Sequence, residues 1–222
     1  MTYQHRDVLG NVLDYSLGKI VCVGQNYADH IKEMNSPSSD QAVFFIKPST
    51  AACSLSPVFS IPTHQGECHH ELELAVLIGE RLKNASVEQA QNAIIATTLA
   101  LDLTLRNLQA QLKSKGHPWE RAKGFDGSAP IGPWLNYQGE NLQDLNLQLS
   151  INGKLVQSGS TTHMLRGCVE LLSQASHCFT LEPGDILLTG TPSGVGPLHV
   201  GDHLVLGLND ALVIESEVKA SV

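Results

Sequence analysis

The stretch HHELELAVLIG, residues 69–79, determines the local fold, because aliphatic and acidic side chains alternate along it. Successive side chains of a β-strand point to opposite faces, so the even-numbered residues from 72 to 78, all aliphatic, share one face. Glu71 and Glu73 share the other face. Two like charges roughly 7 Å apart raise the free energy unless water or a cation lies between them. The stretch therefore predicts a strand with one face in the core and two carboxylates that face either solvent or a cation.

The composition is typical of a globular protein, with 42% hydrophobic, 16% charged and 5% aromatic residues. A chain of 222 residues should bury roughly 70% of its unfolded surface, so we expect a substantial core. We find no internal repeat and no low-complexity segment. Residues 1–222 are therefore expected to form a single domain.

The charge balance excludes several kinds of partner. The net charge is -8, with 22 acidic and 14 basic side chains, which argues against a protein that binds nucleic acid by neutralising phosphates. There is no run of about 20 apolar residues, as a membrane-spanning helix requires, and the first residues lack the apolar segment of a signal peptide. The five cysteines are scattered without a CxxC pair, which fits reduced thiols. We expect a cytoplasmic protein without a membrane partner.

Hydrophobic periodicity and turn residues predict a β-rich mixture of strands and helices, of the α+β class. The Ser86 and Gln89 pair predicts a capping box for a helix that runs to about Ile95. Asn152-Gly153 predicts a two-residue hairpin turn, and a second hairpin is expected around Asn209 and Asp210. The other predicted elements are strands at 19–24, 42–48 and 96–102, helices at 26–34, 105–116 and 163–176, a loop at 35–41, and a turn, short buried strand and Gly/Pro-rich loop at 182–196.

Asp102 strengthens the case for a cation beside the two glutamates. It ends the apolar stretch TTLALDL, where a side chain is poorly placed for solvent, and a buried carboxylate needs a cation or hydrogen bonds. Three carboxylates without paired His or Cys suit a hard ion, either Mg²⁺, Mn²⁺ or Ca²⁺. The alternative for Glu71 and Glu73 is a solvated strand face.

Two pairs of polar residues lie three positions apart on predicted helices, where their side chains can meet. A carboxylate such as Glu33 beside His30 favours the role of the imidazole as a proton acceptor. Arg106, which precedes Gln109 by three positions, can pair with a substrate carboxylate. Taken alone, neither pair is a strong signal, because surface pairs of this kind are common and a solvated helix face is the simpler interpretation.

Two lysines and a glycine-rich stretch are further candidates. Lys47 ends an apolar strand and Lys123 lies in a predicted loop, positions at which isolated lysines are normally exposed. GTPSGVG, residues 190–196, lacks the ending of a phosphate-binding loop and the spacing of a dinucleotide fingerprint, so it is not a nucleotide motif. A tight loop at the mouth of a site is compatible with it.

Nearly the whole chain is spanned by six ordered blocks, which are VGQNYADHIKEM, FFIKP, HHELELAVLIG, ALDLTLRNLQ, KGHPWERAKGFD and LLTGTPSGVGP. In this order and spacing they resemble the fumarylacetoacetate hydrolase family, and they look closest to its short, single-domain, acylpyruvase-like branch. The resemblance implies a mixed β-roll core with few helices and a homodimer.

The resemblance also implies roles for the candidate residues. Glu71, Glu73 and Asp102 would hold Mg²⁺ or Mn²⁺. His30 and Glu33 would activate water from a mobile lid. The expected substrate contacts are Lys47 and Lys123 on its oxygens, Arg106 and Gln109 positioning it, and Thr191 on its carboxylate.

Gln25, in VGQNY, departs from the family pattern, because members of this branch often have Arg there. Glutamine carries no charge, so carboxylate selectivity at this end of the pocket is left open. Gln25 nevertheless remains a candidate for substrate binding.

The resemblance predicts a metal-dependent hydrolase that cleaves the C–C bond of acylpyruvate-type 2,4-dioxo acids, such as acetylpyruvate or fumarylpyruvate, and releases pyruvate. Oxaloacetate decarboxylation or keto–enol tautomerisation uses the same enolate and is an open alternative. A non-catalytic, metal-dependent binder of 2-oxo acids is an alternative of another class.

Overall fold

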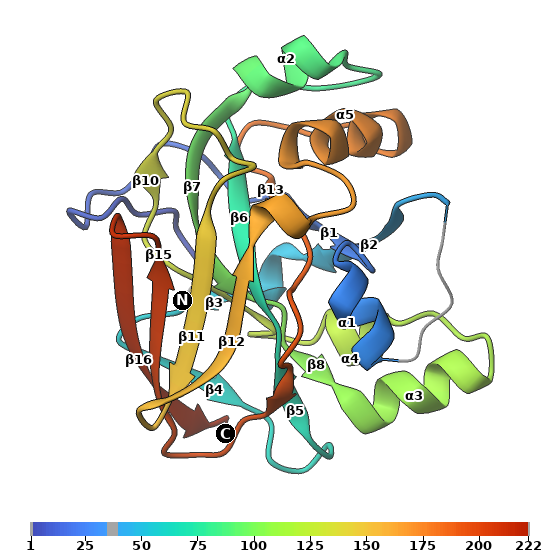
Figure 1. Cartoon of the computed structure of the whole chain (residues 1–222), viewed down its shortest axis with the longest axis vertical. Coiled ribbons are helices and arrows are strands. Elements are labelled where there is room, and N and C mark those ends of the chain that lie inside the picture. The colour runs from blue at the N-terminus through green and yellow to red at the C-terminus, as the bar shows by residue number, and fades with distance from the viewer. Residues whose placement is uncertain (1, 35–39, 222) are drawn as a thin grey trace.

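Residues 69–79 form two strands with Glu71 between them, and the second, longer strand runs through the middle of the molecule (Figure 1). These strands are β5 (Cys68–His70) and β6 (Leu72–Ile78). In this computed structural model, which describes residues 2–34 and 40–221, every residue of β6 is buried. The predicted strand is confirmed from Leu72 to Ile78, but it is interrupted at Glu71 and both of its faces are covered.

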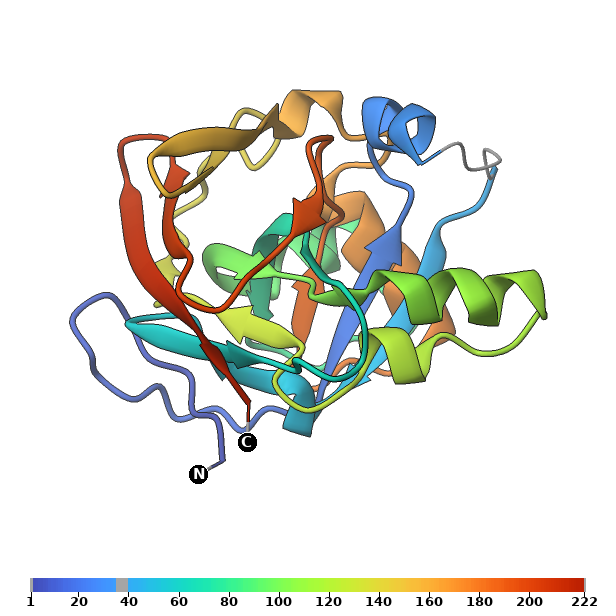
Figure 2. The same ribbon diagram turned by 90° about the horizontal axis from the view of Figure 1, so that it is seen from below.

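Three sheets build the fold, and they curl around a shared interior (Figure 2). The largest has the order β2-β1-β13-β6-β7-β9-β3, with β10 paired to β7. It combines parallel and antiparallel pairs, since β1 is parallel to β13 and antiparallel to β2. Its remaining strands are β1 (Lys19–Gly24), β2 (Val43–Pro48), β3 (Ala52–Ser54), β7 (Ile94–Leu101), β9 (Ala129–Ile131), β10 (Leu135–Asn136) and β13 (Ile186–Leu188).

The second sheet has five strands in the order β12-β11-β15-β16-β4, and a small third sheet has the order β14-β5-β8. Asn152 and Gly153 adopt positive φ angles of 52° and 80°, as a two-residue hairpin turn between β11 and β12 requires. Both predicted hairpins are confirmed. The strands of these sheets are β4 (Val58–Ile61), β8 (Thr104–Leu105), β11 (Asn146–Ile151), β12 (Lys154–Ser160), β14 (Gly196–Pro197), β15 (His203–Leu208) and β16 (Leu212–Ala220).

The helices are short and lie outside the sheets (Figures 1 and 2). None within the described residues is long and apolar enough to span a membrane. The helical elements are α1 (Ala28–Glu33), α2 (Val87–Asn92), α3 (Arg106–Ser114), α4 (Glu120–Lys123), α5 (Cys168–Cys178), η1 (Ser49–Ala51) and η2 (Thr161–His163). The α+β, β-rich fold class is therefore confirmed.

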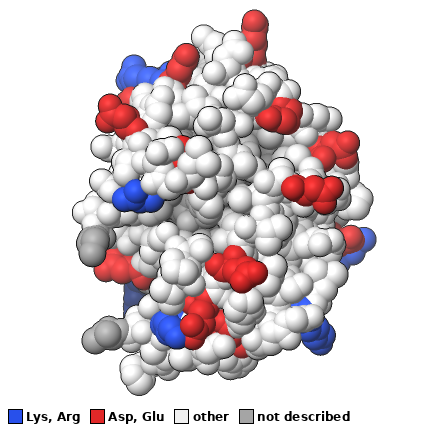
Figure 3. Space-filling view, turned by 90° about the vertical axis from the view of Figure 1, so that its left-hand side faces the viewer, with Lys and Arg blue, Asp and Glu red and all other residues white. Residues whose placement is uncertain are grey.

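β6 separates two apolar cores. Its even-numbered side chains pack in the larger core, between the large sheet and the five-stranded sheet. Ala75 and Leu77 point the other way, into a smaller core that Tyr3, Leu13 and Leu17 of the N-terminal segment help to cover. On the face in Figure 3, acidic side chains are spread over the surface with isolated basic ones among them, in line with the net charge of -8.

Two predicted helix boundaries were wrong. The capping box of Ser86 and Gln89 is present, but α2 ends at Asn92 rather than near Ile95. β-branched Ile94 and Ile95 instead begin β7, where Ile94 pairs with Ile78 of the buried strand β6.

The helix expected at 163–176 begins only at Cys168. Asn26 causes the delay, because its carbonyl accepts a hydrogen bond from Leu165 N and its side-chain oxygen accepts one from Arg166 N. These contacts with a distant part of the chain hold Leu165 and Arg166 in a bend, between the extended residues Met164 and Gly167. The loop predicted at 35–41 lies largely at 35–39, outside the described residues.

His5 joins the N-terminal segment to the rest of the fold, and it is fully buried. Its Nε2 lies 3.0 Å from Gly184 O, and its Nδ1 lies 3.1 Å from the indole nitrogen of Trp134. The indole can only donate, so Nδ1 must accept and the imidazole must be neutral. Burial accordingly lowers the pKa of His5, although the bond to Gly184 acts in the opposite direction.

Folding stability should therefore fall as the pH drops below about 6.5, where an exposed imidazole of the unfolded chain gains a proton that buried His5 resists. We expect His5→Phe to lower the free energy of unfolding at pH 7.5 by about 2 kcal/mol, since two hydrogen bonds are lost. It should also reduce the loss of stability between pH 7.5 and 5.5. Urea unfolding at both pH values measures this, with exposed His64→Gln as the control. An unchanged pH dependence in His5→Phe would contradict the assignment.

Candidate active site

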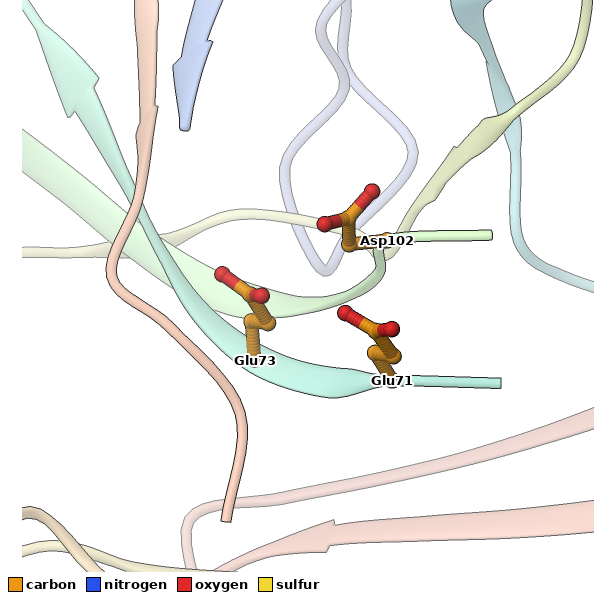
Figure 4. A group of neighbouring side chains, drawn as sticks. All are labelled: Glu71, Glu73 and Asp102. Atoms are coloured by element: carbon orange, nitrogen blue, oxygen red, sulfur yellow. The ribbon is translucent and has the colours of Figure 1, made fainter. Parts of the chain in front are cut away.

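Three buried carboxylates converge where β6 begins and β7 ends, as Figure 4 shows. Pairing of Leu72 with Leu101 sets the register, and Asp102 N donates a 2.9 Å hydrogen bond to Glu71 O. This register places Asp102 beside Glu71 and Glu73, and ligand atoms from the three side chains all lie within 4.8 Å of one another. The side-by-side arrangement predicted for the two glutamates is thus present, and the third predicted acid completes it.

Two cations lie against Glu71. Lys123 Nζ lies 2.9 Å from Glu71 Oε2 and 2.6 Å from Asp102 Oδ2, so it bridges two of the acids. Arg106 binds Glu71 Oε1 at 2.6 Å and donates a second hydrogen bond, of 2.8 Å, to Gln109 Oε1. Thr104 Oγ1 donates a 3.0 Å hydrogen bond to Glu71 Oε1. Glu71 is therefore held by partners from three elements.

The two lysines are not exposed, as isolated lysines normally are. Lys123 is 4% exposed. It lies in the single turn of α4, where the sequence predicted a loop. Lys47 is 0% exposed, at the inner end of β2. Its Nζ lies 2.8 Å from Asp102 Oδ1 and donates to the backbone carbonyls of Leu103, Lys123 and Ser128.

The structure places Lys47 beneath Asp102 and does not bring it into the pocket, where we expected it to contact substrate. Its three N–H donors are all directed at backbone carbonyls, so none is left for a ligand. Lys47 instead acts as a cation that ties Asp102 to the segments on either side of it.

The electrostatic environments of the two glutamates differ. Burial raises the pKa of Glu71, but the nearby Lys123 and Arg106 outweigh burial and hold its pKa well below the usual range. Burial also raises the pKa of Glu73, and the negative charges of Asp102 and Glu71 raise it further. Burial lowers the pKa of Lys123, but the two carboxylates it bridges raise it by more. Glu73 is thus the acid whose charge is least compensated by the protein.

The donor set fits a divalent cation. Glu73 forms no ion pair with any described residue and accepts a hydrogen bond of 2.6 Å from Gly190 N. Asp102 Oδ1 is buried and, despite its proximity to Lys47, accepts no well-angled hydrogen bond. Buried acceptors with spare lone pairs and acid oxygens in one small space are what Mg²⁺ and Mn²⁺ require. Glu71, Glu73 and Asp102 could therefore hold such an ion.

A small cavity of about 60 Å³ opens onto the carboxylates. A water molecule occupies about 30 Å³ of liquid, so the cavity suits an ion and small acids rather than a large ligand. Gln25 reaches it from a left-handed backbone conformation with φ 62°, directly after β1. The predicted site residues that line the cavity are Gln25, His30, Glu71, Glu73, Asp102, Arg106, Gln109, Lys123 and Thr191.

His30 and Glu33 form the predicted pair on α1, with Nδ1 of His30 3.1 Å from Glu33 Oε2. The other oxygen of Glu33 accepts a 2.9 Å hydrogen bond from Gly194 N. A carboxylate against Nδ1 favours a proton on that nitrogen and leaves Nε2 as the acceptor. The pair is thus anchored to the glycine-rich loop, and the ring that lines the cavity can act as a base.

Several residues of the site were missed from the sequence. Phe45, Trp119, Met34 and Lys113 also line the cavity, and Lys113 Nζ lies 5.6 Å from the centre of the Trp119 ring. Phe45 and Trp119 lie within two of the sequence blocks that carry the family resemblance, which was the available signal. The backbone N–H of Gly190 had no such signal, because backbone donors are common to all residues.

Comparison with known proteins agrees with this geometry. Residues 19–219 match the family described as fumarylacetoacetate (FAA) hydrolase C-terminal. The chain belongs to the fumarylacetoacetate hydrolase family. An oxaloacetate tautomerase of Escherichia coli K12 is 48% identical over 207 residues, covering 92% of this chain and 94% of the relative. A mitochondrial oxaloacetate tautomerase of Bos taurus is 42% identical over 204 residues, covering 90% of this chain and 91% of the relative.

Among solved structures of the fumarylacetoacetate hydrolase family, a fumarylpyruvate hydrolase from Pseudomonas aeruginosa in complex with Mn²⁺ and pyruvate has a TM-score of 0.91. It is 30% identical, and the match covers 99% of this chain and 97% of that chain. The family resemblance identified from the sequence is confirmed, and the chain is an enzyme of this family.

Removal of one acid should abolish the metal response. Because Glu73 has no ion-pair partner among the described residues, Glu73→Gln should fold with nearly unchanged stability in metal-free buffer. Mg²⁺ or Mn²⁺ at about 100 times Kd should stabilise the wild type by about 2.7 kcal/mol. Glu73→Gln should lose most of this gain. Thermal unfolding with EDTA or added metal measures it, with exposed Glu80→Gln as the control. Equal metal responses in wild type and Glu73→Gln would exclude the carboxylate site.

Loss of the buried Lys47 cation should destabilise the fold itself. Lys47→Met removes one of the two cations that pair with Asp102 and takes one donor from each of three backbone carbonyls, and removal of one member of a buried ion pair costs about 3–5 kcal/mol. Lys32→Met, in the exposed pair with Asp29, should change stability by less than about 1 kcal/mol. Urea unfolding in EDTA compares the two. Equal effects would mean that Lys47 does not hold the site together.

Proposed function

We propose that this enzyme interconverts the keto and enol forms of oxaloacetate. The observation that carries this proposal is the 48% identity, over 92% of the chain, with an oxaloacetate tautomerase, together with a pocket whose acids, cations and single imidazole suit this reaction. Oxaloacetate carries two carboxylates and a 2-oxo group. The pocket is small, and Arg106, Gln109 and Thr191 line it as donors for anionic oxygens.

Glu71, Glu73 and Asp102 would hold Mg²⁺ or Mn²⁺ in this enzyme. Such an ion supplies a Lewis acid that draws electron density from a nearby 2-oxo group. Arg106 and Lys123 contribute from the protein side: both are ion-paired to Glu71, so they keep that carboxylate ionised and oriented. Lys123 also lines the cavity, where its positive charge would stabilise negative charge that develops on the substrate oxygen.

His30 would move the proton. Its Nε2 would take a proton from carbon 3 of the keto form, and the electron pair of that C–H bond would form the C2–C3 double bond. The C2 carbonyl oxygen would gain the negative charge, and the proton would return to this oxygen to give the enol. Glu33 would keep Nδ1 protonated and the ring oriented, and Gly194 N would hold Glu33.

Hydrolysis of acylpyruvates remains a second candidate, because the His30–Glu33 pair is equally arranged to take a proton from water. Hydroxide would then attack the distal carbonyl, and cleavage of the C–C bond would leave the enolate of pyruvate. The likeness to the Pseudomonas fumarylpyruvate hydrolase supports this candidate. Decarboxylation of oxaloacetate is a third outcome of the same enolate chemistry. A homodimer, a single domain and a cytoplasmic location also remain predictions.

The choice between these reactions can be measured with one protein preparation. Decay of the ultraviolet absorbance of enol-oxaloacetate reports tautomerisation, while pyruvate released from oxaloacetate or acetylpyruvate reports decarboxylation or hydrolysis. We expect fast, metal-dependent decay of the enol with little pyruvate. Pyruvate from acetylpyruvate at a comparable kcat/KM would instead establish the hydrolase.

His30→Ala should lower kcat for tautomerisation by about 10²–10⁴, the usual contribution of a general base. The metal-induced rise in melting temperature should persist, because His30 is not among the carboxylates expected to hold the ion. His177→Ala, an exposed histidine on α5, is the control. Full activity of His30→Ala would remove His30 from the mechanism.

A further inference from the structure

Gln157, on β12, forms four hydrogen bonds, although it lies outside the cavity and is 1% exposed. Its Oε1 lies 2.8 Å from His70 Nδ1 and 3.0 Å from Leu72 N. Its Nε2 donates 2.9 Å hydrogen bonds to Thr191 Oγ1 and Pro192 O. One side chain from the five-stranded sheet thus joins the strand that carries Glu71 to the loop that carries Thr191.

Two backbone groups determine the orientation of the Gln157 side-chain amide, that is, which of its two terminal atoms is the oxygen. Leu72 N can only donate and Pro192 O can only accept, so Oε1 faces Leu72 and the NH₂ group faces Pro192. It follows that His70 donates to Oε1 and that Thr191 Oγ1 receives a hydrogen bond from the amide. The orientation of the Gln157 amide is therefore independent of any choice of histidine tautomer.

The metal side of this bridge holds Glu71 from both directions. His70 and Leu72 are its neighbours in sequence, and both donate to the same oxygen of Gln157. His70, Leu72 and Gln157 are all buried, with exposures of 2% or less. Glu71 itself lies between β5 and β6, outside either strand, and its carbonyl accepts a hydrogen bond from Asp102 N. Gln157 adds a second constraint at that break, through the two residues that flank Glu71.

The substrate side of the bridge orients a hydroxyl. Because the amide of Gln157 donates to Thr191 Oγ1, the hydroxyl proton must point elsewhere. The protein acceptor within its reach is Pro192 O, at a distance of 3.4 Å, and that carbonyl already accepts a hydrogen bond from Gln157. Thr191 lines the cavity, so a substrate carboxylate is the better acceptor for this proton.

The loop is also seated tightly on β12. A Cβ on Gly194, which has φ 97°, would lie 2.2 Å from Val156 O. A Cβ on Gly159 would lie 2.5 Å from the side chain of Pro192. Both glycines thus permit a close approach that larger residues would prevent, and this approach brings Gln157 within reach of Thr191 and Pro192.

We propose that Gln157 is a positioning residue that works through two arms: its oxygen holds the Glu71 segment for the metal, and its NH₂ group turns the Thr191 hydroxyl toward the carboxylate of the substrate. The second arm rests on the proposed function only in that the ligand is a 2-oxo acid. Gln157 touches neither ligand itself. It makes the metal segment and the substrate loop one rigid unit.

Gln157→Glu separates the two arms, because it retains an acceptor for His70 and Leu72 but replaces the NH₂ group with a second acceptor. We expect the Kd for Mg²⁺ to remain within about twofold of wild type. The Kd for pyruvate at saturating Mg²⁺, and KM for enol-oxaloacetate, should rise roughly tenfold, the lower end of the usual effect of residues that orient metal-site ligands. Gln157→Met, which loses both arms, should also raise the Kd for Mg²⁺ by about tenfold.

A double-mutant cycle with Thr191→Val tests whether Gln157 acts through the hydroxyl. Thr191→Val alone should weaken the binding of pyruvate as much as Gln157→Glu does. In the Thr191→Val background, Gln157→Glu should cause little further loss of pyruvate affinity. Ser158→Ala, at the exposed neighbouring position of β12, is the control. Circular dichroism confirms folding of each variant. If Gln157→Glu does not fold, Gln157→Met replaces it in the cycle with the same expectation for pyruvate at saturating Mg²⁺.

Additive effects of the two substitutions on pyruvate binding would overturn the proposal, as would an equal loss of Mg²⁺ and pyruvate affinity in Gln157→Glu. Pyruvate binding by isothermal titration calorimetry requires no turnover. An enzyme that binds pyruvate with Mg²⁺ but does not tautomerise oxaloacetate would therefore refute the proposed reaction and still test the role of Gln157.

Discussion

The burial of three carboxylates in one small space is the constraint on which the rest of the structure depends. Isolated buried charges are very unfavourable, and adjacent like charges increase the cost. In the fold, Lys123 and Arg106 form ion pairs with Glu71, while Lys123 and Lys47 form ion pairs with Asp102. Glu73 is left with a single backbone donor. The protein therefore compensates two acids by itself, and the third gives the cluster its capacity for a divalent ion.

This electrostatic requirement explains features that local propensity does not. α4 is a single turn, too short to be stable alone, but it delivers Lys123 to two carboxylates and its final carbonyl to Lys47. Lys47 donates hydrogen bonds from Nζ to three backbone carbonyls around Asp102. Elements that are weak by themselves are thus held in place by the charges they bring together.

The arrangement also explains how one site can serve related reactions. In the proposed mechanism, the acid cluster and its cations would bind the 2-oxo acid end of a substrate, which tautomerisation, decarboxylation and hydrolysis have in common. The His30–Glu33 pair lies on a separate element and is joined to the glycine-rich loop through Gly194. The three reactions would differ in whether this pair takes a proton from carbon or from water. Enolate stabilisation and proton transfer would therefore be carried by different parts of the chain.

The sequence by itself determined the strand with Glu71 and Glu73 on one side, both hairpin turns, the capping box at Ser86, and the identity of the three acids. These features depend on side-chain alternation, turn chemistry and helix spacing, all of which act over a few residues. The resemblance of six ordered blocks added the family.

Only the tertiary structure decided where the long-range partners lie. No local pattern indicated that Lys47 is buried, that residues 120–123 form a helical turn, or that α5 begins only at Cys168, because the partners in each case are distant in the chain. Gln157 is the clearest case. An isolated glutamine on an otherwise ordinary strand becomes the link between His70 and Thr191 only when the five-stranded sheet packs against the loop at 190–196, since hydrogen bonds depend on position in space and not on separation in sequence.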